Sequence, residues 1–200
     1  SMEKVTEGQI DELMSVYKDL YDIDPNANID SIREQAKIEI GIKTFLDKGG
    51  YTAFTTNFQA LHGMKQLPGL AAQHLMAEGY GFGAEGDWKT AALLRAMKVM
   101  ADGKSTGLME DYTYNLDAEN GLILGAHMLE VCPTLAGSKP RIEVHPLGIG
   151  DKEDPARLVF KGASGPAVAA SLIDMGNRFR LIVNSVDAVE MTEDMPNLPV

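Results

Sequence analysis

The sequence predicts an α/β fold in its first half and a β-rich fold in its second half. As far as about residue 101, segments with helical periodicity alternate with short apolar runs flanked by glycine. After the turn at residues 102–105, only short apolar runs separated by glycine, proline and asparagine follow. We therefore expect a layered α/β domain with a mostly parallel sheet over residues 1–104. The start of a β-rich, largely antiparallel domain, a partial barrel, is expected over residues 105–200.

Four segments of the first half have apolar residues at helical spacing. They are residues 6–21, 29–47, 67–78 and 88–101. Asn28 or Asp30 can cap the second helix, Pro68 opens the third, and Gly86 or Asp87 can begin the fourth. These helices account for most of the expected α/β domain.

Short apolar or β-branched runs predict the strands. In the first half they are residues 51–58 and 80–84, and in the second half residues 122–124, 142–144, 157–160, 167–173 and 178–183. The first two lie between predicted helices, which favours parallel pairing, whereas the later ones follow one another directly and favour antiparallel pairing.

Composition excludes several classes of protein. The 200 residues carry a formal net charge of −11, and the basic residues are scattered, so neither a nucleic acid nor an anionic membrane is an expected partner. There is one cysteine, Cys132, which we expect to be buried, so no intramolecular disulfide can form. No apolar run is long enough for a membrane helix, and the N-terminus has no apolar leader core. A cytoplasmic location is therefore expected.

The glycine-rich segment 81–89 is the first candidate site. It follows a predicted strand and precedes a predicted helix, which is where ligands gather in open α/β sheets. Glu85 in this loop could bind a cation. Alternatively, the glycines only form a tight turn and Asp87 only caps the next helix. A nicotinamide-dependent enzyme would need a phosphate loop and an acidic ribose ligand, and the segment has neither pattern.

Two further residues are candidates from the second half. Glu110 lies among aromatic residues and could end a strand at a cleft, or it could be a solvated loop acid. His127 lies in an apolar run and could be a ligand, or a hydrogen-bonded core histidine. We expect His74 to lie on a helix surface. The motifs of zinc proteases, serine hydrolases and P-loop proteins are absent from the sequence.

Taken together, several ordered blocks resemble the L-arabinose isomerase family. The blocks are residues 67–71, 79–82, 85–95, 109–114, 127–133, 147–150 and 154–158. The resemblance implies an aldose–ketose isomerase that interconverts L-arabinose and L-ribulose, and in some members D-galactose and D-tagatose, through an enediol. It also implies a cytoplasmic homo-oligomer.

The resemblance further implies a metal site, usually occupied by Mn²⁺, with Co²⁺ as an alternative. Glu85 and Glu110 match the two glutamate ligands of the family, and His127 matches the first of two histidine ligands. The second histidine would lie beyond Val200. Glu85 and Glu110 are also the expected catalytic pair, which would move a proton between neighbouring carbon atoms. If this is right, the three side chains converge on one point.

Three other residues match positions close to the family's site. Phe58 matches an aromatic residue that lines the substrate, and Asp87 and Glu130 match acidic residues that we expect to support the ligands. The chain would then correspond to the central domain and the first part of the C-terminal domain of the enzyme. A competing interpretation is a folding or assembly module with no turnover of its own, because one ligand and the N-terminal domain are missing.

Overall fold

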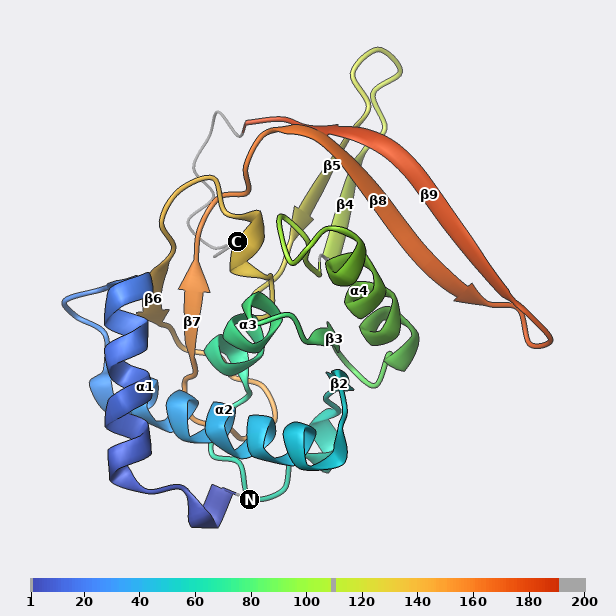
Figure 1. The fold of residues 1–200 in the computed structure, drawn as a ribbon. Helices are drawn as coiled ribbons and strands as arrows, with labels where there is room; N and C mark the ends of the chain where they lie inside the picture. The colour runs from blue at the N-terminus through green and yellow to red at the C-terminus, as the bar shows by residue number, and fades with distance from the viewer. Residues whose placement is uncertain (1, 109–110, 191–200) are drawn as a thin grey trace.

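The computed structural model describes residues 2–108 and 111–190 (Figure 1). The helices are α1 (Glu7–Leu20), α2 (Ile29–Gly49), α3 (Gly69–Ala77) and α4 (Trp88–Met100). The strands of the first half are β1 (Asp22–Ile23), β2 (Ala53–Thr55) and β3 (Gly81–Gly83). Those of the second half are β4 (Asp111–Asn115), β5 (Leu122–Ala126), β6 (Arg141–Val144), β7 (Ala156–Val159), β8 (Gly165–Asp174) and β9 (Phe179–Ala188). Short 3-10 helices span Met2–Lys4, Phe58–Ala60 and Pro133–Leu135.

Side-chain caps determine where the first two helices begin. Thr6 Oγ1 accepts the backbone N–H of Gln9, and the Gln9 side chain accepts the backbone N–H of Thr6, so both unpaired donors are satisfied. Asn28 caps α2 through the Asp30 backbone N–H, as one of the two expected caps. Gly50 ends α2 with a φ of 66°, a left-handed conformation that glycine adopts without steric cost.

The strands pair in small sheets of both kinds, and the α/β class is confirmed. β1 runs parallel to β6, which runs antiparallel to β7, and β2 runs parallel to β3. The pairs β4–β5 and β8–β9 are antiparallel hairpins, as expected for the second half. Within the described residues these strands do not close a barrel.

The largest core combines residues from both halves of the chain. In Figure 1, α1, α2 and α3 gather around β6 and β7. The buried apolar residues of this core are Ile10, Met14, Tyr17, Tyr21, Ile32, Ala36, Leu70, Val131, Ile142, Ala156, Leu158 and Phe160. The Gln73 side chain of α3 forms hydrogen bonds to the backbone of the second half of the chain. Its Nε2 donates to Val131 O and Leu158 O, and its Oε1 accepts the Leu158 N–H. Residues on both sides of the boundary expected near residue 104 therefore share one apolar core.

Two expectations for the first half were wrong. The strand expected over residues 51–58 extends only from Ala53 to Thr55, because the Asn57 side chain accepts the Gln59 N–H and turns the chain into a 3-10 helix. His74 is not on the surface but 4% exposed, because α3 is enclosed on nearly every side. Cys132 is buried, as expected.

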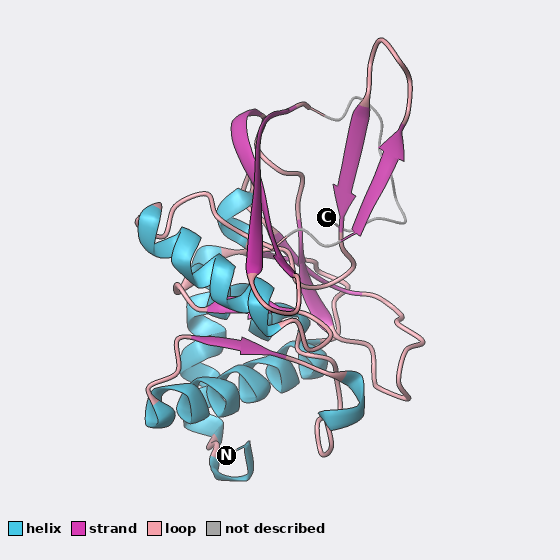
Figure 2. Cartoon of the chain, turned by 90° about the vertical axis from the view of Figure 1, so that its right-hand side faces the viewer, coloured by secondary structure: helices cyan, strands magenta, loops and turns pink. Residues whose placement is uncertain are grey.

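The hairpin β8–β9 extends away from the helical part of the molecule (Figures 1 and 2). Most of its residues are exposed on both faces, including Val168, Leu181 and Val183. It touches α4 where the rings of Trp88 and Phe179 meet edge to face, 5.8 Å apart. None of the described helices is both long enough and apolar enough to cross a membrane.

Candidate functional site

Helix α4 packs directly on the backbone of β3, and glycine makes this possible. A Cβ atom at Gly81 would lie 2.1 Å from Ala91 O, and one at Gly83 would lie 2.2 Å from Asp87 O. Both distances are far below van der Waals contact with backbone atoms that cannot move independently. The loop between β3 and α4, which carries Glu85, is therefore anchored at both ends.

Glu85 itself has a strained backbone. Its φ is 54°, in the left-handed region that side-chain-bearing residues rarely adopt. The neighbouring Gly86 N–H donates to Thr56 O at 2.7 Å, and the Asp87 N–H donates to Ala84 O at 2.9 Å, so the surrounding bonds hold this conformation. The Glu85 side chain is exposed. The loop therefore holds an exposed carboxylate on a backbone conformation that few non-glycine residues adopt.

Asp87 begins helix α4, as the sequence allowed. Its Oδ1 accepts the backbone N–H groups of Lys89 and Thr90, and its Oδ2 accepts the Thr90 hydroxyl. Partial burial acts to raise the pKa of Asp87, but the hydrogen bonds from Thr90 and Lys89 outweigh it, so the pKa lies below its ordinary value. The carboxylate that follows Glu85 is therefore committed to the helix N-terminus.

Phe58 lies at the same edge of the parallel pair as Glu85. It follows β2 and Glu85 follows β3, and the two strands run parallel, so both residues come after the carboxyl ends of adjacent strands. The bond from Gly86 N–H to Thr56 O joins the two loops. Phe58 is 44% exposed, so its ring is accessible from solvent. An accessible aromatic ring and a carboxylate beside one sheet edge can receive a polar ligand with apolar faces, such as a sugar.

His127 follows β5 and is paired with Glu130. Its Nδ1 lies 3.1 Å from Glu130 Oε2, and the Glu130 residue is 6% exposed. The same nitrogen accepts the backbone N–H of Glu130 at 3.2 Å and that of Leu129 at 3.5 Å. The Glu130 carboxylate and these backbone groups together hold the imidazole ring of His127 in one orientation.

Glu110 lies outside the described residues. The expected convergence of Glu85, Glu110 and His127 on one point therefore stays a prediction. The structure does bring Phe58 and Glu85 to one sheet edge, and it pairs His127 with Glu130.

A second polar cluster is buried between α1, α2 and α3. His74 Nδ1 lies 2.7 Å from Glu39 Oε1, and the Tyr17 hydroxyl donates to Glu39 Oε2 at 2.6 Å. The rings of Tyr17 and Tyr21 meet the His74 ring edge to face. Glu78 lies one helical turn after His74, and its carboxylate pairs with Lys43 Nζ at 2.6 Å.

The surroundings of His74 and Glu39 favour keeping a proton on this pair, because the pKa of each group is raised. Burial opposes the imidazolium form of His74, but the hydrogen bond and charge of Glu39 outweigh it, so the His74 pKa is raised. Burial also raises the pKa of Glu39, against the effect of its bonds to His74 and Tyr17. Glu39, His74 and Glu78 each offer a ligand atom within 4.8 Å of the others. All three are already committed to protein partners, so we interpret the cluster as a structural network.

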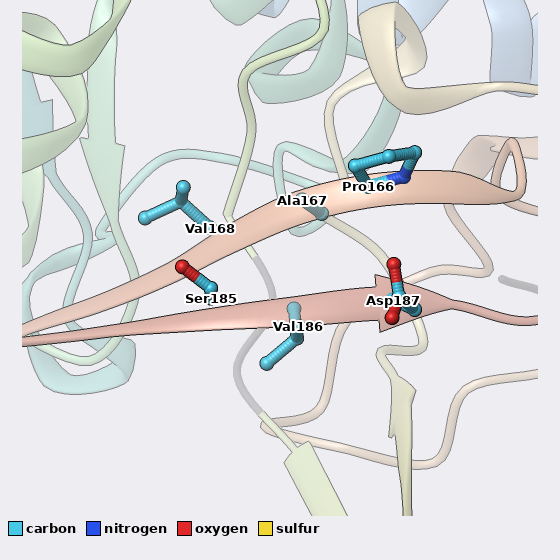
Figure 3. A pocket seen from close by; sticks show the side chains of 6 residues that line it. All are labelled: Pro166, Ala167, Val168, Ser185, Val186 and Asp187. Carbon is cyan, nitrogen blue, oxygen red and sulfur yellow. The ribbon is translucent and has the colours of Figure 1, made fainter.

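Two hollows lie away from the Glu85 loop. One, of about 480 Å³, is formed beside α1 and α3 and reaches His74 and Glu78. The other, of about 360 Å³, lies along hairpin β8–β9, where Val168 and Val186 point to opposite sides of the ribbon (Figure 3). Its lining has one carboxylate, Asp187, and no histidine, so it lacks the donors of a metal site.

Sequence reasoning missed the Glu39–His74 network. The four-residue spacing of His74 and Glu78 on one predicted helix was a visible signal, since such residues share a helix face. The partner Glu39 lies on another helix, and nothing local links the two.

Two family models match the chain, one on each side of residue 104. The model of the L-arabinose isomerase central domain matches residues 1–103, and the model of the L-arabinose isomerase C-terminal domain matches residues 105–200.

Individual relatives agree with the family models. An L-arabinose isomerase of Clostridium beijerinckii is 86% identical over 200 residues, which cover 100% of this chain and 41% of that protein. That of Geobacillus stearothermophilus is 68% identical over 201 residues, 98% of this chain and 40% of that protein. That of Bacillus subtilis is 60% identical over 204 residues, 100% of this chain and 41% of that protein. The chain thus spans about two-fifths of the length of these relatives.

Proposed function

The chain belongs to the L-arabinose isomerase family, and we propose that it supplies metal ligands and part of the substrate site of an aldose–ketose isomerase. The proposed substrates are L-arabinose and L-ribulose, with D-galactose and D-tagatose as a second pair. The identity of 86% along the full chain to an L-arabinose isomerase carries this proposal. Because the chain spans only about two-fifths of such a protein, we expect turnover to need the remaining segments.

The donor set suits a divalent cation. Glu85, Glu110 and His127 would hold Mn²⁺, or Co²⁺ in its place, since carboxylates and imidazole are ligands that both ions accept. Two observations support this assignment. The strained backbone at Glu85 presents an exposed carboxylate, and the Glu130 carboxylate beside His127 Nδ1 is the kind of partner that orients a metal-binding histidine. When bound, the cation would supply Lewis-acid polarisation of the sugar carbonyl.

The residues of the chain would divide the remaining tasks. A carboxylate, Glu85 or Glu110, removes a proton from the carbon beside the carbonyl, and the same group returns it to the former carbonyl carbon through an enediol. The proton of the neighbouring hydroxyl passes to the former carbonyl oxygen in the same conversion. Phe58 covers an apolar face of the sugar and helps to exclude water from the enediol. Glu130 holds the His127 ring in place through its contact with Nδ1. Oligomer formation and a cytoplasmic location belong to the same proposal.

Replacing Glu85 by glycine is expected to stabilise the chain while weakening metal binding. Glycine relieves the left-handed strain, which costs roughly 1 kcal/mol for a residue with a side chain. It also deletes one proposed ligand, so the Mn²⁺ affinity should fall at least about tenfold. Urea unfolding measures the first effect, and electron paramagnetic resonance of free Mn²⁺ measures the second.

Asp102→Gly is the matched control. Asp102 has almost the same φ, 53°, but lies beyond the C-terminus of α4. It should gain stability similarly and leave the Mn²⁺ affinity unchanged. Equal Mn²⁺ affinity in Glu85→Gly and the unsubstituted chain would sink the ligand assignment. Appreciable conversion of L-arabinose by the 200-residue chain alone would contradict the expected need for the other segments.

A further inference from the structure

Lys98 is a buried lysine that holds no carboxylate partner within residues 2–108 and 111–190. It is 1% exposed and lies in the last turn of α4. Its Nζ donates to Thr106 O at 2.7 Å and lies 3.3 Å from Cys132 Sγ. Burying an ammonium group without an ion pair is costly, and the carbonyl end of the α4 dipole offsets only part of that cost. A neutral side chain of similar length would fill the same space without the desolvation cost of a charge, so the charge of Lys98 needs an explanation.

The two partners of Lys98 stand at the two ends of one segment. Thr106 precedes and Cys132 follows residues 107–131, which carry His127. Thr134, which follows Cys132, also binds Thr106. Its hydroxyl donates to Thr106 O at 2.9 Å and accepts the Thr106 N–H at 3.2 Å. The ends are in close contact, because a Cβ at Gly107 would lie 2.7 Å from the Cys132 Cβ. Lys98 thus bonds both ends of the segment at once.

The other end of α4 is fixed to the Glu85 loop. Asp87 caps the helix, and the backbone of β3 packs against it at Gly81 and Gly83. One helix therefore joins the loop that carries Glu85 to the ends of the segment that carries His127.

We propose that Lys98 is a positioning residue that fixes the His127 segment relative to Glu85 by tying Thr106 and Cys132 to helix α4. The proposal rests on the proposed metal-binding function of Glu85 and His127. A lysine suits this role because one ammonium group can donate to several acceptors at once, and a hydrogen bond from a charged donor is stronger than one from a neutral donor.

The test compares Lys98→Met, Lys98→Arg and two control variants of the 200-residue chain. Mn²⁺ alone is titrated by electron paramagnetic resonance, and amide hydrogen exchange is followed at residues 106–108 and 131–135. Lys98→Met should weaken Mn²⁺ binding at least about tenfold and speed exchange at both ends of the segment. Lys98→Arg should recover most of both losses, because it keeps a charged donor.

The controls separate positioning from general stability. Lys104→Met removes an exposed lysine nearby, and Met14→Ala weakens the core beside α1 without touching α4. Neither should alter Mn²⁺ affinity at temperatures where the chain stays folded. Equal Mn²⁺ affinity in Lys98→Met and the unsubstituted chain overturns the proposal, as does an equal loss in Met14→Ala. If the unsubstituted chain binds no Mn²⁺, its proposed function fails. Hydrogen exchange alone then decides: unchanged exchange in Lys98→Met overturns the role of Lys98, and faster exchange supports it.

Discussion

Replacing Gly81 by alanine is expected to destabilise the chain by about 3 kcal/mol, at the upper end of what overpacking costs. The new Cβ would lie 2.1 Å from Ala91 O, 2.7 Å from Arg95 Cβ and 2.9 Å from Arg95 N. Two of these three atoms are backbone atoms of α4, so a rotamer change cannot relieve the clash. The helix must move away from β3 and take the Glu85 loop with it. Urea unfolding followed by circular dichroism measures the loss.

Gly8→Ala provides the opposite result in the same experiment. Gly8 lies inside α1 and has no heavy atom within 4 Å of a built Cβ. Alanine there should stabilise the chain by roughly 0.5–1 kcal/mol, the usual gain for glycine-to-alanine in a helix. Equal stability of Gly81→Ala and Gly8→Ala would contradict the close packing of α4 on the backbone of β3.

Replacing Glu39 by alanine should cost roughly 3–5 kcal/mol at pH 6, the range for removing one partner of a buried charged pair. The substitution leaves the His74 ring and the Tyr17 hydroxyl without their acceptor. The loss should depend on pH. A raised His74 pKa means that the folded chain binds a proton more tightly than the unfolded chain does. This stabilisation is complete below the unfolded histidine pKa, near 6.5, and is lost as the pH rises through the folded value.

Glu39→Gln isolates the charge, because glutamine can still bond His74 and Tyr17. Its deficit relative to the unsubstituted chain should be largest near pH 6 and should shrink as the pH approaches 9. The raised pKa of Glu39 means that the folded chain also holds the Glu39 proton more tightly than the unfolded chain does. This contribution to stability likewise falls as the pH rises. The charge of Glu78 raises the His74 pKa and that of Lys43 lowers it, so the two effects partly cancel. Lys43→Met should therefore raise the His74 pKa further. A deficit of Glu39→Gln that stays constant from pH 6 to 9 would contradict this account.

The helices were predictable because their signals are local. The Asn28 and Asp87 caps and the apolar periodicity of α1, α2 and α4 lie within one or two turns of sequence. β1 had no such signal: Asp22 and Ile23 form a strand only because they pair with Arg141 and Ile142. The buried position of His74 was missed for the same reason. Its acceptor Glu39 lies on another helix, and polar residues without a visible partner are normally assigned to the surface.

The candidate site was predictable only in its residue types. The sequence identified Glu85 as a candidate through its neighbours, but the left-handed backbone that presents its carboxylate depends on bonds to Thr56 and Ala84. Lys98 was not noticed, because on a helical wheel it is one more basic residue near a helix end. Its role follows from Thr106 and Cys132, which the fold brings to its ammonium group.

The pairing of β1 with β6 also sets an order of events during synthesis. Asp22 leaves the ribosome long before Arg141, and at about 5–20 residues per second the wait lasts on the order of ten seconds. During that time Ile10, Met14 and Tyr17 of α1 lack the β6 and β7 side chains that cover them in the finished core. The nascent chain therefore exposes an apolar face of α1 that chaperones can recognise. Slower translation before residue 160 should lengthen this exposure and lower the yield of folded protein.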